Sequence, residues 1–230
     1  EDERAGFLRE IFDSTATDYD KVERTLALGT GPWYRRRALE RAGLAPGMRV
    51  VDVGSCTGLV AAPALKIIGS ADLLTGVDPS PAMMGASPLA KQVKLVEGKA
   101  ERIPLPDACA DFLSMGYALR HVSDVSAAFS EFHRVLKPGG RLCILEITKP
   151  EGAVGNALLK GYMRGWVPLA ARLSGSATHT PRIWRYYWDS IEACAPPARI
   201  LETLRAAGLV EANRYVELGI FSEYRARKPV

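Results

Sequence analysis

Apolar and polar positions along this chain alternate between short runs rich in β-branched residues and longer segments with helical spacing. The apolar runs predict strands buried on both faces, at residues 48–53, 73–78, 93–97, 111–117 and 141–148. The helical segments lie between them, at residues 59–68, 81–90 and 125–136. This alternation is typical of an α/β fold in which helices cover both faces of a parallel sheet.

Two regions depart from the alternation. Residues 1–41 carry apolar positions that predict helices flanking the core. Residues 151–195 combine aromatic side chains with several arginines, which predicts either a helical lid over an apolar substrate or an ordinary packed helix. A helix at 197–206 and two strands at 211–218 and 219–226 follow, and their short link favours an antiparallel hairpin at the sheet edge.

Length and composition predict one domain. The chain has 230 residues, of which 47% are hydrophobic and 24% charged, enough for one sizeable core. We expect a single domain over 1–230, with 1–41 as an N-terminal helical segment and 42–150 as the ligand-binding core. Residues 151–195 are then the helical lid, and 196–230 the terminal helix and hairpin.

Charge and cysteine usage narrow the cellular context. No apolar run reaches the roughly 18 to 20 residues that span a bilayer, and the first residues are acidic, so we expect a cytoplasmic protein. The four cysteines are far apart and form no CxxC pair, which favours reduced thiols and no metal site. The net charge is +4, with basic residues scattered except at 35–37, so we expect no nucleic-acid partner.

The clearest chemical signal is VVDVGSCTG at residues 50–58, a strand that ends near an acid and enters a glycine-containing turn before a helix. Gly54 and Gly58 let the backbone turn tightly and approach a ligand, and the following helix offers free N–H groups. The next strand ends in GVDPS at 76–80, where Asp78 suits two hydrogen bonds from a ribose. The spacing Gly54-x-x-x-Gly58 departs from the G-x-G-x-x-G of nicotinamide-binding folds.

These residues resemble motif I and motif II of the class I S-adenosylmethionine (SAM)-dependent methyltransferases, which implies a Rossmann-like seven-stranded sheet with an antiparallel terminal hairpin. Most similar is the ubiquinone/menaquinone C-methyltransferase family, through an ordered set of segments. These are FDSTATDYD at 12–20, GKAERIPLPD at 98–107, YALRHVSD at 117–124, LKPGGRL at 136–142, LEITKP at 145–150 and WRYYWDSI at 184–191.

The resemblance implies that SAM is the cofactor and that residues at the strand ends bind it. The glycines of the first turn would face its methionine and ribose parts, the acid of the second strand its ribose hydroxyls, and the 98–107 loop its adenine. The implied cofactor-binding residues are Asp52, Gly54, Ser55, Cys56, Gly58, Asp78, Pro79, Ala100, Glu101 and Gly116.

Three residues are candidates for catalysis. The resemblance places Tyr19 and Arg120 near the transferred methyl group and a quinol substrate. Arg120 would stabilise a phenolate and His121 would take its proton, directly or through water, because carbon methylation of a hydroquinone ring requires an ionised phenol. The alternative for Tyr19 and His121 is a purely structural role.

This chain departs from the family where function is most sensitive. The family usually has glycine at Cys56, aspartate at Leu59, asparagine at Lys99 and asparagine at His121. A side chain at Cys56 replaces hydrogen where the backbone approaches the ligand, so we expect Cys56 to weaken or reshape SAM binding. A catalytic thiol is the rival interpretation, although only the helix terminus would lower its pKa.

Three functions remain open at this stage. The first is methylation of a small aromatic or quinol-like acceptor by in-line displacement, and the second is N-, O- or C-methylation of a non-quinone secondary metabolite. The third is a SAM-binding protein that transfers no methyl group. A prenyl quinol acceptor would add peripheral membrane contact, and a homodimer is a further expectation.

Overall fold

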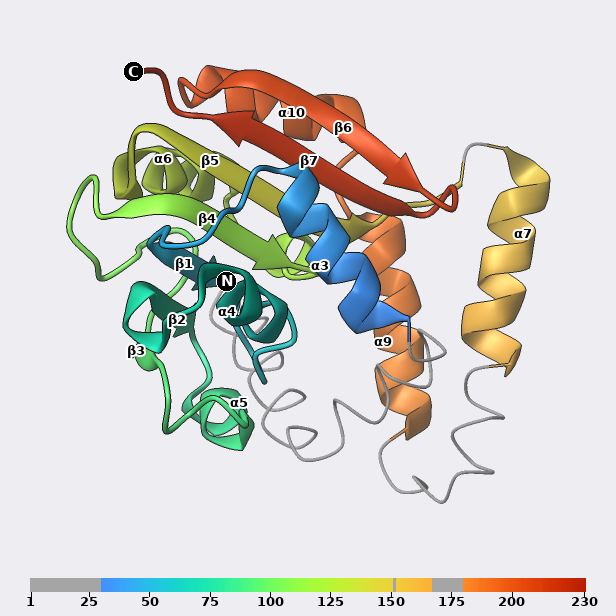
Figure 1. Cartoon of the computed structure of the whole chain (residues 1–230). Coiled ribbons are helices and arrows are strands. Elements are labelled where there is room, and N and C mark those ends of the chain that lie inside the picture. Colours follow the sequence, from blue (N-terminus) through green and yellow to red (C-terminus); the bar gives the residue numbers. More distant parts are fainter. Residues whose placement is uncertain (1–29, 151, 167–179) are drawn as a thin grey trace.

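The structure is a computed structural model that describes residues 30–150, 152–166 and 180–230 (Figure 1). The strands of this part form one seven-stranded sheet in the order β3-β2-β1-β4-β5-β7-β6, which confirms the predicted fold class. Their bounds are β1 Val50–Val53, β2 Leu74–Asp78, β3 Lys94–Glu97, β4 Ala110–Gly116, β5 Leu136–Ile147, β6 Val210–Glu217 and β7 Phe221–Arg227.

The first five strands run parallel, and β7 pairs antiparallel with both β5 and β6. Strand β1 lies between β2 and β4, so the chain first extends the sheet on one side of β1 and then on the other. Such a reversal brings the carboxyl ends of β1 and β4 side by side, where open α/β sheets bind ligands.

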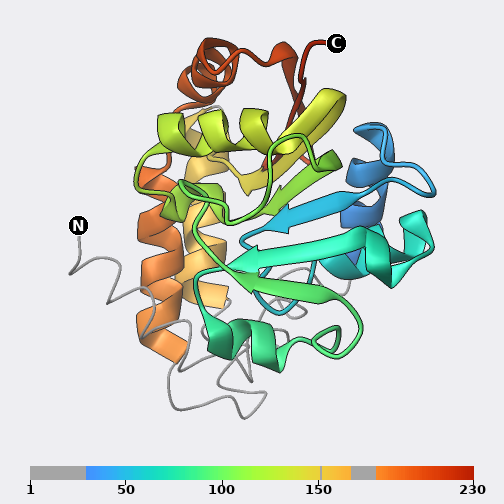
Figure 2. The ribbon, with the colours of Figure 1, turned by 90° about the vertical axis from the view of Figure 1, so that its left-hand side faces the viewer.

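Helices cover both faces of the sheet (Figure 2). Successive residues of β1 point to opposite faces, because Val51 and Val53 pack with the helices α6 and α10, whereas Val50 packs with α3 and α4. The helices of these two layers are α3 Gly31–Arg41, α4 Ala61–Ile68, α6 Val125–Val135 and α10 Pro197–Ala206. Burial on both sides explains why β1, β2 and β4 read as continuous apolar runs. The prediction was wrong for β3, which is a partly exposed strand at the edge of the sheet.

The shorter helices lie at the ends of strands and in the predicted lid. They are η1 Ala71–Leu73, α5 Pro81–Ala86, η2 Leu119–His121, α7 Ala153–Gly161, the π-helix η3 Tyr162–Trp166 and α9 Thr180–Ala193. The lid segment is therefore helical where it is described, and α9 contacts η2 at the end of β4. None of the described helices has the length and apolarity that a membrane span requires.

The structure differs from the predicted elements in one helix and at two turns. The helix predicted at 81–90 ends at Ala86, where Ser87 takes an extended backbone. Residues 137–140, between the helix predicted to end at 136 and the strand predicted to begin at 141, belong to β5, because this strand already pairs at Leu136 with Ala110 before a register shift. Within this stretch Gly139 has a left-handed backbone conformation, and its N–H donates to the carbonyl of Lys228. The terminal hairpin has a three-residue link at 218–220 instead of two residues.

Helix α3 is joined to the terminal hairpin by a buried carboxylate. Arg41 donates hydrogen bonds from two guanidinium nitrogens to Glu223, whose side chain is fully buried on β7, and it also lies 3.2 Å from Glu217. The same helix carries Arg36, which pairs at 2.8 Å with Glu40 in an exposed position. The two arginines therefore differ mainly in the burial of their partners.

Replacing Arg41 by methionine removes the cation that neutralises a buried carboxylate, so we expect a loss of about 3 kcal/mol of unfolding free energy. Urea denaturation measures this loss. The matched variant Arg36→Met breaks only an exposed pair and should cost less than about 1 kcal/mol. Equal losses in the two variants would contradict the special role of Glu223.

Candidate functional site

The turn that follows β1 adopts left-handed backbone at three positions. Gly54 has φ 67°, Cys56 φ 51° and Gly58 φ 90°. The N–H groups of Gly54 and Ser55 both donate to the carbonyl of Val77 in β2, at 2.8 and 3.1 Å. The turn is thus fixed to the neighbouring strand, and the chain reaches α4 from the carboxyl edge of the sheet.

Glycine is required at Gly54 for packing as well as for its backbone conformation. A Cβ atom there would lie 2.6 Å from the Cβ of Ala118, which follows β4. At Gly116, the last residue of β4, a Cβ would collide with the side chain of Val60. These two predicted cofactor residues therefore let the segment at the end of β4 approach the turn after β1 and the start of α4 closely.

Asp78 connects the ends of β1 and β2. Its Oδ2 atom accepts a hydrogen bond from the N–H of Cys56 at 2.8 Å, and its Oδ1 atom accepts one from Ser80 at 2.9 Å. The side chain of Cys56 also hydrogen-bonds to this carboxylate. A carboxylate offers about four acceptor positions in all, which suits it to hydroxyl donors. Pro79 leads from Asp78 into α5, where the Ser80 side chain caps the helix by accepting from the N–H of Met83.

Asp52 lies beneath the turn in the interior of the sheet. Its side chain is buried, and its Oδ1 atom accepts a hydrogen bond from the Ser114 hydroxyl of β4 at 2.6 Å. Burial raises the pKa of Asp52 to about 7, although hydrogen bonds from Ser114 and Ser55 oppose this shift. Asp52 therefore supports the turn from below, and its direct contact with a cofactor stays a prediction.

The thiol of Cys56 is not an activated nucleophile. Burial and the nearby carboxylates of Asp78 and Asp52 raise its pKa well above the ordinary value of a thiol. The group is therefore protonated at neutral pH, which disfavours a catalytic thiol. The positive φ of Cys56 shows that the turn keeps the backbone path of a glycine although the side chain is present.

The predicted adenine loop runs from the end of β3 toward β4. Its first N–H, at Gly98, donates to the carbonyl of Asp78, which ties the loop to the end of β2. Ala100 is buried, and the carboxylate of Glu101 accepts hydrogen bonds from the N–H groups of Ser123 and Asp124 at 2.7 and 3.4 Å. Glu101 thus joins this loop to the segment that precedes α6.

Arg120 and Glu146 form a buried ion pair at the ends of β4 and β5. Their side chains approach to 2.5 Å, and a carboxylate oxygen of Glu146 also accepts from the backbone N–H of Arg120 at 3.2 Å. The Nε of Arg120 donates to Ser190 of α9 at 3.2 Å. Arg120 therefore holds the lid helix against the sheet, and its role as a cation for a phenolate stays a prediction.

His121 meets the lid helix through a second contact. Its Nδ1 atom lies 2.6 Å from the hydroxyl of Tyr186 in α9, and the two rings are stacked with centroids 5.5 Å apart. His121 is only partly buried, so it stands at the boundary between the lid helix and the end of β4. The third catalytic candidate, Tyr19, lies outside the described residues.

Sequence reasoning missed several residues of this site. Arg35, from the basic run at 35–37, was not among the predicted site residues, but it is buried and its guanidinium lies 5.6 Å from the ring centre of Tyr117. Tyr117 itself has a positive φ of 57° directly after β4. Helical spacing, which places Arg35 beside the buried Ala38 and Leu39, is the signal that could have found it.

The described residues fit SAM as the cofactor. Asp78 offers acceptor capacity for ribose hydroxyls at a sheet edge where Gly54 and Gly58 carry no side chain, and the turn keeps its left-handed path at Cys56. These features match what a nucleoside attached to a flexible chain requires.

Asp52 predicts a pH dependence of stability. Its pKa rises from 3.8 in the reference state to about 7 in the folded protein, so the folded state retains a proton that the unfolded chain releases. The contribution of Asp52 to stability therefore falls as pH rises from about 4 to about 7. We expect Asp52→Asn to flatten this part of the pH profile of the unfolding free energy, measured in urea. An unchanged profile in the variant would contradict the shift.

Cys56→Gly should remove backbone strain and a side chain from the turn. We expect a gain of up to about 1 kcal/mol in unfolding free energy and a several-fold lower dissociation constant for SAM, measured by calorimetry. Ala108→Gly is the matched control, because Ala108 also has a positive φ, 48°, but lies away from the turn. An unchanged dissociation constant in Cys56→Gly would show that the thiol does not affect SAM binding.

Comparison with solved structures shows the same fold. A SAM-dependent methyltransferase from Aquifex aeolicus has a TM-score of 0.64 at 21% identity, over 91% of this chain and 98% of that chain. The [4+2]-cyclase SpnF has a TM-score of 0.65 at 19% identity, over 97% and 95% of the two chains. The likeness to a cyclase shows that this fold alone does not fix the reaction.

Sequence comparison identifies the family. The model of the ubiE/COQ5 methyltransferase family matches residues 1–228. A ubiquinone/menaquinone biosynthesis C-methyltransferase UbiE from Azotobacter vinelandii is 30% identical over 100% of this chain and 92% of its own length. A demethylmenaquinone methyltransferase from Deinococcus radiodurans is 32% identical over 93% and 89% of the two chains. The chain therefore belongs to the ubiE/COQ5 methyltransferase family and is a SAM-dependent methyltransferase.

Proposed function

We propose that this enzyme methylates a ring carbon of a small quinol-like acceptor. The observation that carries the proposal is the contact between His121 and Tyr186, at the junction of the lid helix and the end of β4. It sets a titratable group beside the sheet edge that holds the predicted cofactor residues. The names of the relatives from Azotobacter vinelandii and Deinococcus radiodurans support a quinone-pathway acceptor.

When bound, SAM supplies an electrophilic methyl group on a sulfonium, and the residues of the chain align and protect the reactants. Asp78 would accept hydrogen bonds from the ribose hydroxyls, and the turn at Gly54 and Gly58 would face the methionine part. Because methyl transfer is an in-line displacement, fixing the acceptor and excluding water supply most of the catalysis. We assign the exclusion of water to α7, η3 and α9, the described helices of the lid.

The contact with Tyr186 determines which ring nitrogen of His121 carries the hydrogen. If Nδ1 of His121 carries a hydrogen and donates it to the Tyr186 oxygen, Nε2 holds the lone pair that accepts the phenolic proton. The phenolate then makes the ring carbon nucleophilic. The bound sulfonium would supply the methyl group to that carbon, the carbon would then lose its ring proton to restore aromaticity, and His121 would return the phenolic proton to the oxygen. One proton leaves the site in each turnover.

Arg120 contributes a fixed positive charge at the same junction. Its pairing with Glu146 makes the local net charge close to zero, so Arg120 positions His121 and α9 more than it attracts anions. Hydrogen bonds from Arg120 to Glu146 and Ser190 keep the lid helix in register with the residues that follow β4.

A second candidate is N- or O-methylation of a non-quinone small molecule. One observation favours it, namely that His121 stands where the resembling family has asparagine. An acceptor whose own heteroatom is deprotonated by His121 would need no carbon nucleophile. The two candidates therefore differ in the atom that receives the methyl group.

The deciding experiment incubates the purified chain with methyl-labelled SAM and two acceptor panels, reduced benzoquinols and naphthoquinols in one and heteroaromatic amines and phenols in the other. We expect label in the quinol panel on a ring carbon, located by carbon NMR. Label on nitrogen or oxygen would establish the second candidate. Label in neither panel, with SAM still bound by calorimetry, would contradict both.

His121→Asn tests the proposed base. We expect kcat with the labelled quinol to fall about a hundredfold near neutral pH, and the acidic limb of the pH–rate profile to disappear. His133→Asn is the control, because His133 lies in the last turn of α6 beside Gly208. Unchanged kcat in His121→Asn would show that His121 is structural, while leaving the methyl transfer itself intact.

A further inference from the structure

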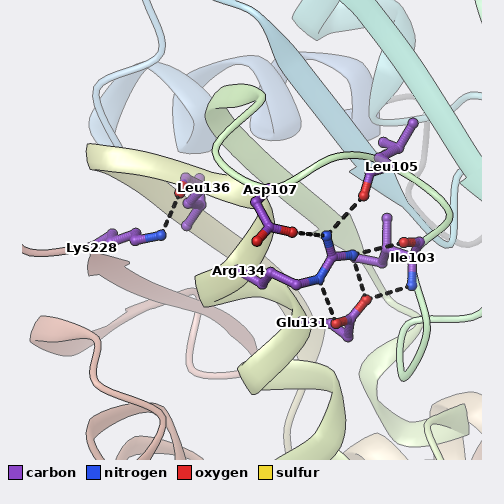
Figure 3. Close-up of polar contacts among 7 residues, drawn as sticks. All are labelled: Ile103, Leu105, Asp107, Glu131, Arg134, Leu136 and Lys228. Atoms are coloured by element: carbon purple, nitrogen blue, oxygen red, sulfur yellow. Dashed lines mark hydrogen bonds and ion pairs between the residues drawn. The ribbon is translucent and has the colours of Figure 1, made fainter.

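Helix α6 presents two charged side chains to the predicted adenine loop at 98–107. Glu131 and Arg134 are three residues apart on this helix, and the side chains of both contact the loop (Figure 3). The Nε of Arg134 bonds to Oε1 of Glu131 at 2.7 Å, and its Nη2 bonds to Oε2 at 2.8 Å. We call this pair of residues the α6 clamp.

The α6 clamp holds the loop by its backbone. Glu131 accepts a hydrogen bond from the N–H of Ile103 at 2.8 Å, and Arg134 donates to the carbonyl of the same residue at 2.8 Å. Arg134 also donates to the carbonyl of Leu105 at 2.8 Å. The two side chains thus bond to N–H and carbonyl groups of a loop, which belong to neither a helix nor a strand ladder.

The planar guanidinium is matched to this task. Its Nε and Nη2 atoms donate to the Glu131 carboxylate. Other N–H groups of the guanidinium donate to the carbonyls of Ile103 and Leu105 and, at 2.7 Å, to the carboxylate of Asp107. Hydrogen bonds from Arg134 and Ile103 keep the pKa of Glu131 below its ordinary value although partial burial opposes them. The clamp therefore stays charged throughout the pH range near neutrality.

The loop is also tied on the N-terminal side of the clamp. The N–H of Gly98 donates to the carbonyl of Asp78, and the carboxylate of Glu101 accepts from the N–H of Ser123. Ile103, two residues after Glu101, is 3% exposed and belongs to the core cluster that includes α6. Ala100 and Glu101 lie between Gly98 and Ile103, so their positions depend on the contacts at both.

We propose that Glu131 and Arg134 are positioning residues for the adenine end of SAM. They touch no reacting atom and act through Ile103 and Leu105, which set the path of the loop that carries Ala100 and Glu101. The proposal concerns cofactor binding alone, so it stands or falls independently of the methyl acceptor.

The test compares affinities of purified variants for S-adenosylhomocysteine by calorimetry, well below their unfolding temperatures. We expect Arg134→Gln to raise the dissociation constant about tenfold, because the loop loses two backbone contacts and the fork. Arg134→Lys should recover only part of the affinity, since an ammonium group cannot meet the carboxylate and two carbonyls in one plane. Glu131→Gln should resemble Arg134→Gln, because it weakens the same contacts.

A second ligand separates positioning from general stability. An analogue of S-adenosylhomocysteine that lacks the 6-amino group of the purine should bind wild type more weakly than the parent compound, and Arg134→Gln should lose much of this discrimination. Arg199→Gln is the matched control, because Arg199 also pairs with a glutamate three residues on, Glu202, but on the exposed face of α10. It should leave both affinities unchanged.

Unfolding free energies from urea denaturation complete the comparison. Lower stability of Arg134→Gln with wild-type affinity and discrimination would overturn the proposal, because the clamp would then be purely structural. If Arg134→Gln does not fold, Arg134→Lys and Glu131→Gln decide the matter by the same two readouts. Wild-type discrimination in both of those variants would equally overturn it.

Discussion

The site depends on one carboxylate. Asp78 accepts the N–H of Cys56 from the turn after β1 and the N–H of Ser80 at the start of α5, so it joins two strand ends that are separate in the sequence. A charged acceptor makes such hydrogen bonds stronger than neutral ones. The same carboxylate is the group expected to bind the ribose, so the residue predicted to hold the cofactor also shapes the turn beside it.

The backbone strain of the turn held by Asp78 lies at Cys56, which has a positive φ. An L-residue in left-handed backbone costs roughly 1 to 2 kcal/mol, and the hydrogen bond from Cys56 to Asp78 offsets part of that cost. The chain therefore keeps the geometry of a glycine turn while placing a thiol beside two acidic residues. The departure from the family alters the chemistry of the turn more than its path.

Two helices outside the sheet complete the site. Helix α6 holds the adenine loop through Arg134, and α9 contacts the residues after β4 through Ser190 and Tyr186. In Figure 2 the parallel strands point toward the side on which α9 lies, so the lid helix stands at the carboxyl edge of the sheet. The cofactor half of the site thus rests on the sheet and α6, and the acceptor half on the junction with α9.

The amino-acid pattern predicted most of the sheet, because burial on both faces makes the inner parallel strands visible as apolar runs, and it placed α10 at its observed bounds. It also determined the glycine turn and Asp78, since both follow directly from strand ends. It placed the start of β5 incorrectly, because Leu136 pairs with Ala110 and the extended pairing of a distant strand overrides local turn residues.

Which side chains meet depends on contacts between distant parts of the chain. The pairing of Arg120 with Glu146 joins residues 26 positions apart, and the contact of His121 with Tyr186 joins residues 65 positions apart. The burial of Arg35 likewise depends on packing against Tyr117. Spacing along a chain fixes which face of a helix or strand a side chain occupies, but its partner belongs to another element. Long-range packing therefore decided the interactions that the local pattern left undetermined.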